Sequence, residues 1–65
     1  MKNRVRELRK NQKLTQEELA ELIGISRQAI NAIEKEKFDP SLQTAFKMTK
    51  VFKTSIEDLF MYENK

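Results

Sequence analysis

Apolar residues recur along the chain at the three- and four-residue spacing of amphipathic helices, and strict alternation of apolar and polar residues is absent. This pattern predicts an all-α fold and argues against a sheet-based one. The first helix is expected from about Asn3 to Gln12, with Val5 and Leu8 on its apolar stripe. We predict a single domain over residues 1–65, built from five short helices.

Capping residues mark where the next two helices begin and end. Thr15 and Glu18 have the spacing of a capping box, which places the start of the second helix at Gln16. Gly24 is expected to end that helix, because glycine readily takes the left-handed conformation that closes helices. Ser26 can cap the third helix. The connecting turn is so short that the two helices must cross steeply, which is the helix-turn-helix arrangement, here at about residues 16–35.

Two further serines introduce the C-terminal helices. Ser41 is expected to cap a fourth helix and Ser55 a short fifth helix that runs through Phe60. The apolar residues expected to face inward from the second, third and fourth helices are Leu19, Ala20, Leu22, Ile23, Ile30, Ile33, Leu42, Ala45, Phe46, Met48 and Phe52. The segment 61–65 can alternatively pair as a short strand with residues 2–4, and the sequence leaves this open.

The outer face of the third helix carries hydrogen-bonding side chains close to its N-terminus. Arg27, Gln28 and Asn31 lie on or beside this face, and a helix presented in this way can insert its first turns into the major groove of DNA. Arginine can pair with guanine through two hydrogen bonds, and glutamine can do so with adenine. An ordinary solvated helix face is the alternative, but the helix-turn-helix setting favours base readout.

The motifs in this region resemble those of a known family. Residues 16–20, 24–28 and 30–34 are similar to the Cro/CI-type helix-turn-helix repressors of the xenobiotic-response-element family, and the similarity extends through residues 40–42 and 56–60. The resemblance implies a five-helix, lambda-repressor-like domain. It also implies a transcriptional repressor that binds palindromic operator DNA as a homodimer.

By position, the resemblance also assigns roles to individual residues. The expected base-reading residues are Arg27, Gln28 and Ala32, with Asn31 beside them. Gln16 matches a phosphate contact at the start of the second helix. The chain departs from the family at Glu36, where glycine is usual, and at Lys53, where glycine or asparagine is common. A non-glycine residue with a positive φ costs about 1 kcal/mol, so we expect local strain at these two loops.

The distribution of charge is consistent with a nucleic-acid partner. The net charge is +3, and residues 1–13 contain six basic residues against the single acid Glu7. A solvated helix face would explain this basic segment equally well if it were considered alone. The residues expected to contact phosphates are Gln16, Lys10, Lys13, Lys35 and Lys37.

Two opposite charges fall beside apolar stripes that face each other. Arg9 lies four residues after Val5, and Glu34 lies four residues after Ile30. We therefore predict a partly buried ion pair between the first and third helices, as the resemblance also implies. The alternative is two unrelated charges at the edges of their stripes.

The C-terminal segment offers more apolar surface than one short helix can bury, and a domain of this size has a marginal core. A second copy of the chain would cover this surface. The predicted dimer interface is Leu59, Phe60, Met61 and Tyr62. In the competing interpretation Phe60 folds back onto Phe46 or Phe52 and the protein is a monomer.

Other function classes find little support in the sequence. The chain has no His and no Cys, which excludes disulfides and thiolate metal sites and removes the commonest general base. We expect no enzyme activity, cofactor, metal or small-molecule ligand. No apolar run is long enough to span a membrane and no signal-peptide core follows the first residues, so we expect a cytoplasmic protein. The alternative function is an antitoxin-like or adaptor module that uses the same fold to bind protein.

Overall fold

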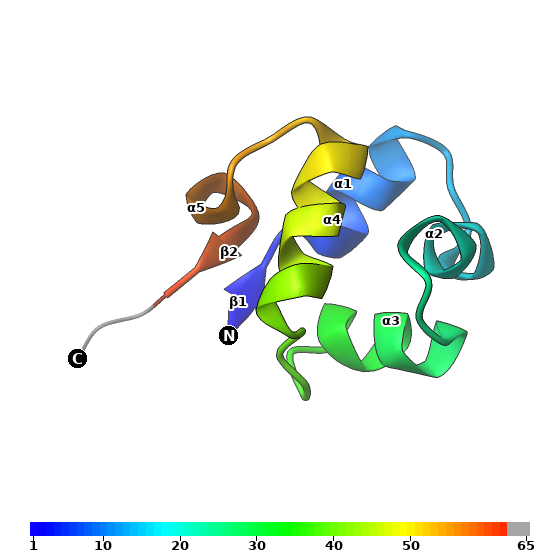
Figure 1. The fold of residues 1–65 in the computed structure, drawn as a ribbon, viewed down its shortest axis with the longest axis horizontal. Helices are drawn as coiled ribbons and strands as arrows, with labels where there is room; N and C mark the ends of the chain where they lie inside the picture. The colour runs from blue at the N-terminus through cyan, green and yellow to red at the C-terminus, as the bar shows by residue number, and fades with distance from the viewer. Residues whose placement is uncertain (63–65) are drawn as a thin grey trace.

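A computed structural model describes residues 1–62 and shows an all-α fold with a short strand pair (Figure 1). Within these residues no helix is long and apolar enough to cross a membrane. In Figure 1, α4 crosses in front of α1, with α2 and α3 on one side and α5 and the strands on the other. The elements are, in order, β1 (Lys2–Asn3), α1 (Val5–Asn11), α2 (Gln16–Ile23), α3 (Arg27–Glu34), α4 (Leu42–Phe52), α5 (Ile56–Leu59) and β2 (Phe60–Met61).

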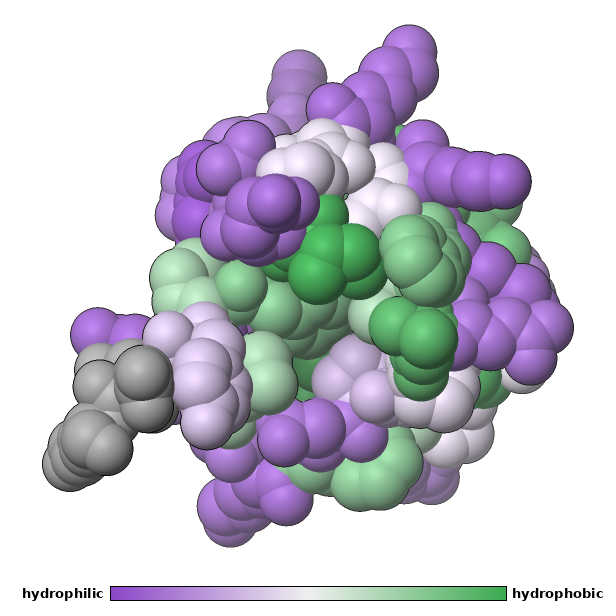
Figure 2. Space-filling model, turned by 60° about the vertical axis from the view of Figure 1, so that its left-hand side comes forward, coloured by the Kyte–Doolittle hydropathy of each residue, from purple (hydrophilic) through white to green (hydrophobic). Residues whose placement is uncertain are grey.

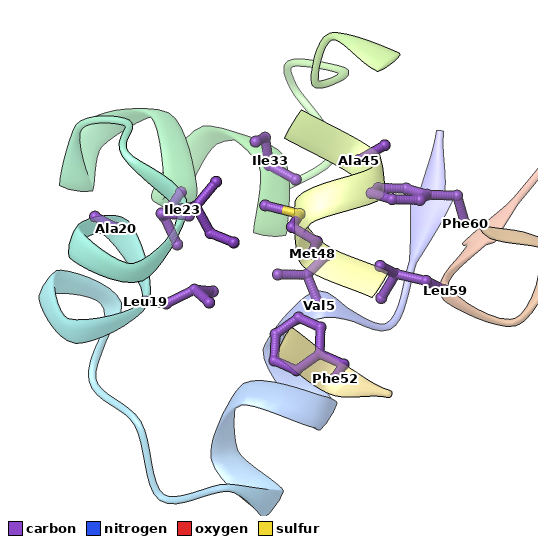
Figure 3. Packing of buried hydrophobic residues seen from close by; sticks show 11 residues of the cluster. Val5, Leu19, Ala20, Ile23, Ile33, Ala45, Met48, Phe52, Leu59 and Phe60 are labelled. Carbon is purple, nitrogen blue, oxygen red and sulfur yellow. The ribbon is translucent and has the colours of Figure 1, made fainter. Parts of the chain in front are cut away.

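One apolar core holds the five helices together. Met48 of α4 lies at its centre, between Ile33 of α3 and Val5 of α1 (Figure 3). All three side chains are fully buried. The core consists of Val5, Leu19, Ala20, Ile23, Ile30, Ile33, Ala45, Met48, Phe52, Leu59 and Phe60. The prediction of five helices around one core is confirmed.

The capping residues identified from the sequence form the expected bonds. The Thr15 hydroxyl accepts from the Glu18 backbone N–H at 3.0 Å, and a Glu18 carboxylate oxygen accepts from the Thr15 backbone N–H at 2.8 Å. Gly24 ends α2 with φ of 88°. A Cβ atom at Gly24 would meet nothing within 4 Å, so the left-handed backbone, and not crowding, is what favours glycine there.

The two ends of the chain differ from the prediction because they pair with each other. Helix α1 begins at Val5 instead of Asn3, and α5 ends at Leu59 instead of Phe60. The freed residues form two antiparallel strands, in which Asn3 is opposite Phe60. This pairing satisfies backbone groups that a longer helix would otherwise have satisfied. The alternative of a short terminal strand pair is thus confirmed for Met61, which pairs with Lys2, but the strand ends before Tyr62, and residues 63–65 lie outside the described residues.

The side chain of Asn3 fastens this strand pair to the helices. Its Nδ2 donates to the carbonyl of Ile33 at 2.9 Å, and its Oδ1 accepts from the backbone N–H of Val5 at 3.1 Å. One side chain therefore bonds the first residue of α1 and a carbonyl near the end of α3.

Three apolar residues expected in the core lie on the surface. Leu22 is 60% exposed, Leu42 is 70% exposed and Phe46 is 51% exposed. Each has a spacing that fits a wide apolar stripe, but each points away from the neighbouring helices. The helices that carry these residues were predicted correctly, but the prediction that the three side chains face the core was wrong.

Among residues 1–62, three non-glycine residues adopt a positive φ. The strained loops expected at Glu36 and Lys53 are present, with φ of 63° and 54°. Lys13 also has a positive φ, of 59°, which the sequence did not indicate. Each such residue costs about 1 to 2 kcal/mol relative to an ordinary conformation. Lys13 and Lys53 place a cation at a helix C-terminus, where the helix dipole favours one.

Candidate nucleic-acid interface

Helices α2 and α3 form the predicted helix-turn-helix unit. In Figure 1, α2 is seen nearly end-on while α3 lies across the view, so the two helices cross steeply. Residues 24–26 connect them. Leu19, Ile30 and Ile33 are fully buried, and this apolar contact fixes the angle at which α3 is presented.

The N-terminus of α3 is open to solvent and lacks acidic residues. Arg27 and Gln28 occupy its first two positions, and both are exposed. The Ser26 hydroxyl accepts from the Ala29 backbone N–H at 3.1 Å and so anchors the start of the helix. Within residues 1–62 neither Arg27 nor Gln28 has a side-chain hydrogen bond. Both side chains are therefore available to a ligand, while the backbone beneath them is held in place.

A buried ion pair fastens α3 to α1, as predicted. The Arg9 Nε lies 2.7 Å from Glu34 Oε2, and the Arg9 Nη2 lies 3.3 Å from Glu34 Oε1. The two side chains are only 10% and 4% exposed. A third Arg9 donor, Nη1, bonds the Leu14 carbonyl at 2.7 Å. A guanidinium that faces a carboxylate through two hydrogen bonds sets orientation as well as attraction, so α3 is held in register with α1.

The amide of Gln16 extends this ion pair to the outer face of α3. Its Nε2 donates to Glu34 Oε1 at 3.1 Å, and its Oε1 accepts from Asn31 Nδ2 at 3.5 Å. Gln16 was predicted as a phosphate contact and Asn31 as a base contact. Each amide nitrogen has two hydrogens and uses one of them here, so each retains a donor for a ligand.

A polar cavity of about 240 Å³ lies where α1, α2 and α3 meet, and it brings several of these residues together. Its lining residues are Arg6, Arg9, Gln16, Asn31, Glu34 and Lys35. Because Arg9 and Glu34 neutralise each other, Arg6 and Lys35 leave an excess of positive charge. The cavity is therefore suited to an anionic group.

Arg6 was not predicted as a site residue. Its signal in the sequence is that it lies three residues before Arg9, which places both on neighbouring positions of the α1 surface. Lys10, Lys13 and Lys37 are exposed but do not line the cavity. Ala32 is half-buried on α3. Within residues 1–62 no group of three or more acidic side chains gathers as a metal site would require.

Burial within the subunit removes two of the four residues from the predicted dimer interface. Leu59 is fully buried and Phe60 is 8% exposed, so both contact the core of their own subunit and neither is available to a second chain. The Phe60 ring points to the side of α4 near Ala45 (Figure 3). It is turned inward because β2 pairs with β1. Met61 is half-buried and Tyr62 is 77% exposed.

Comparison with known proteins places this geometry among transcription regulators. A family model described as helix-turn-helix matches residues 5–59. The chain is 55% identical to an HTH-type transcriptional regulator of Methanocaldococcus jannaschii, over 98% of this chain and 97% of that protein. It is 45% identical to the HTH-type transcriptional regulator YgzD of Bacillus subtilis, over 100% of this chain and 98% of that one.

A solved structure has the same fold. The crystal structure of the restriction-modification controller protein C.AhdI from Aeromonas hydrophila superposes with a TM-score of 0.78. The two sequences are 33% identical, and the match covers 88% of this chain and 86% of the controller protein.

Proposed function

The chain belongs to the helix-turn-helix family of DNA-binding transcriptional regulators, which are not enzymes, and from that premise we propose that it is a repressor that binds a palindromic operator as a homodimer. The observation that carries this proposal is the N-terminus of α3. Two exposed side chains, Arg27 and Gln28, project there from a helix that a buried ion pair holds in place. Such a helix can enter the major groove with its first turn leading.

In the proposed complex the base contacts come from α3. Arg27 pairs with guanine through O6 and N7, and Gln28 pairs with adenine through N6 and N7. Asn31 uses its remaining amide hydrogen, and Ala32 contacts a thymine methyl group. The absence of an acid from the first turn of α3 supports this arrangement, because a carboxylate there would repel the phosphates that flank the groove.

Phosphate contacts surround the base-reading face. Gln16 and Lys35 meet at the polar cavity, and Arg6 adds a further cation. We assign a backbone phosphate to this cavity, held by the free amide hydrogen of Gln16 and by the two cations. Further exposed cations that would add affinity without sequence preference are Lys10, Lys13 and Lys37.

For dimerisation we propose the exposed flank of α4 that borders α5 and β2. Leu42 and Phe46 are exposed and lie one helical turn apart. Lys47 reaches the Ile23 carbonyl of α2 at 3.5 Å, and Phe46 lies about 100° from Lys47 around the helix, so Phe46 does not share the position that faces α2. Figure 2 shows the face that carries α5 and β2, where apolar side chains run across the middle between polar ones. Met61 and Tyr62 complete the proposed interface.

A two-fold axis through this surface would determine the form of the operator. Each dimer would present two α3 helices about 34 Å apart, one turn of DNA, to two half-sites of opposite orientation. A small protein that occupies such a site excludes other proteins from it, which is why we propose repression. It would act where the genome is, in the cytoplasm.

Selection of genomic fragments with the purified protein tests the proposal. We expect recovered fragments to share a palindrome, and their affinity to fall steeply as salt rises, because phosphate contacts release counterions. An antitoxin-like or adaptor module would recover no common sequence, and its affinity for DNA would be weak at all salt concentrations. That result would reject the repressor.

A further inference from the structure

Three non-glycine residues within the described part of the chain have a positive φ, and Glu36 is the one that is negatively charged. Lys13 follows α1 and Lys53 follows α4, so each adds a cation where the helix dipole is negative. Glu36 follows α3 with φ of 63° and places an anion at that kind of position. It therefore combines a strained backbone with an unfavourable charge.

Within residues 1–62 the Glu36 side chain gains no compensating contact. It is exposed, and its carboxylate takes part in no ion pair or hydrogen bond. Its backbone N–H donates to the Ile33 carbonyl at 3.0 Å, but any residue with an N–H could do the same. Local features that are unfavourable for the fold and uncompensated within it tend to occur at functional sites.

The position of Glu36 suggests what that function is. It lies between Lys35 and Lys37, directly after the end of α3. Lys35 lines the polar cavity to which a DNA phosphate is assigned above. When α3 lies in the major groove, the loop that follows it runs beside the DNA backbone. An acidic side chain between Lys35 and Lys37 then repels DNA phosphates, whatever the base sequence.

We propose that Glu36 limits the affinity of the protein for the DNA backbone, an inference that rests on the proposed function. Phosphate contacts supply almost all non-specific binding, which competes for the protein along the whole genome. The Glu36 carboxylate weakens the phosphate contacts, which contribute to specific and non-specific binding alike. Occupancy of an operator then depends more strongly on the base contacts of α3 and on dimer formation.

The test compares Glu36→Gln with a matched control, Glu57→Gln. Both variants remove one exposed negative charge, but Glu57 lies in α5, on the opposite side of the molecule from α3 in Figure 1. Binding is measured on a random-sequence duplex and on a selected operator fragment. We expect Glu36→Gln to bind both about 3- to 10-fold more tightly at low salt, and this gain to shrink at about 1 M salt, where screening is strong. Glu57→Gln is expected to change either affinity by less than about 2-fold.

A second variant separates charge from backbone strain. Glu36→Gly removes both, so a tightening seen with Glu36→Gly but not with Glu36→Gln would overturn the proposal in favour of loop conformation. Equal affinities for Glu36→Gln and Glu57→Gln would also overturn it. So would a gain on the operator alone, which would place Glu36 in base readout. The wild-type protein decides the proposed function separately. If it binds the operator with steep salt dependence, the proposed function stands even when the role of Glu36 is rejected. If it binds no DNA, the proposed function and the role of Glu36 are both refuted.

Discussion

The helix-turn-helix side of the molecule differs from the side formed by α4, α5 and β2 in how its side chains are partnered. Between α1, α2 and α3, polar side chains bond one another, from Arg9 through Glu34 and Gln16 to Asn31. On α4, large apolar side chains such as Phe46 are left exposed. The polar side chains of the first side are hydrogen-bonded within the chain. The apolar side chains of the second side stay exposed among the described residues.

This difference follows from the energetics of the two kinds of group. A buried polar group without a partner is costly, so it must be satisfied within its own subunit before any ligand arrives. An apolar side chain tolerates exposure, and a second chain can stabilise it later. If the proposed function holds, the DNA-facing side is preorganised in the monomer, while the opposite side would acquire its final contacts on dimerisation.

The largest expected effect comes from removing one partner of the buried ion pair. Arg9→Met should lower the free energy of unfolding by about 3 to 5 kcal/mol, because Glu34 is left charged and desolvated. The double variant Arg9→Met with Glu34→Leu should recover most of that loss, since a buried pair replaced by apolar residues is often neutral. Urea denaturation of the single variants and the double variant gives the coupling energy. A coupling near zero would show that the pair does not hold α3 to α1.

An exposed pair at the start of α1 is the control for this experiment. The hydrogen bond from Arg4 at 3.0 Å lowers the pKa of Glu7, yet both side chains are open to solvent. Glu7→Gln should therefore leave the denaturation midpoint almost unchanged.

The next effect tests the apolar side. Phe46→Asp should convert a dimer of twice 7.7 kDa into a monomer in light scattering at micromolar concentration. Loss of a central aromatic contact typically removes about 2 to 4 kcal/mol from an interface. Leu22→Asp introduces the same charge at another exposed apolar position, on α2, and should leave the mass unchanged. If the wild-type protein is itself monomeric, the apolar side of α4 is not a dimer interface.

A smaller effect distinguishes base contacts from phosphate contacts on the polar side. Arg27→Ala should weaken binding to the operator by about 1 to 3 kcal/mol and change binding to random DNA little. Lys10→Ala should weaken both by a similar factor and reduce the salt dependence. Competition titrations on the two DNAs measure this difference. Equal losses on both for Arg27→Ala would mean that Arg27 does not read sequence.

The smallest effect concerns backbone strain at the end of α3. Glu36→Gly should stabilise the fold by about 0.5 to 1 kcal/mol, because relief of the positive φ outweighs the added freedom of the unfolded chain. Lys53→Gly should gain less, since it also removes a favourable cation from the C-terminus of α4. Thermal unfolding of the two variants checks the order. A larger gain for Lys53→Gly would contradict it.

Local sequence patterns were sufficient to predict that five helices form and to predict much of the candidate site. The capping box at Thr15 and the glycine at position 24 fixed the bounds of α2, because each bonds or bends the backbone within one turn. The register of Arg9 and Glu34 beside apolar stripes predicted their ion pair, since helical periodicity sets which side of a helix a residue occupies. The roles of Arg27 and Gln28 stay predictions that DNA binding must test.

Other features depended on which segments meet in space. Helical periodicity places Phe46 on a definite side of α4, but whether another element covers that side depends on the packing of the whole chain. Phe60 is buried because β2 pairs with β1 from the other end of the chain, a long-range contact with no local sequence signal. Arg6 joins the polar cavity only because α1, α2 and α3 converge there. Capping and periodicity act within a few residues, whereas burial and the composition of a cavity are properties of the assembled fold.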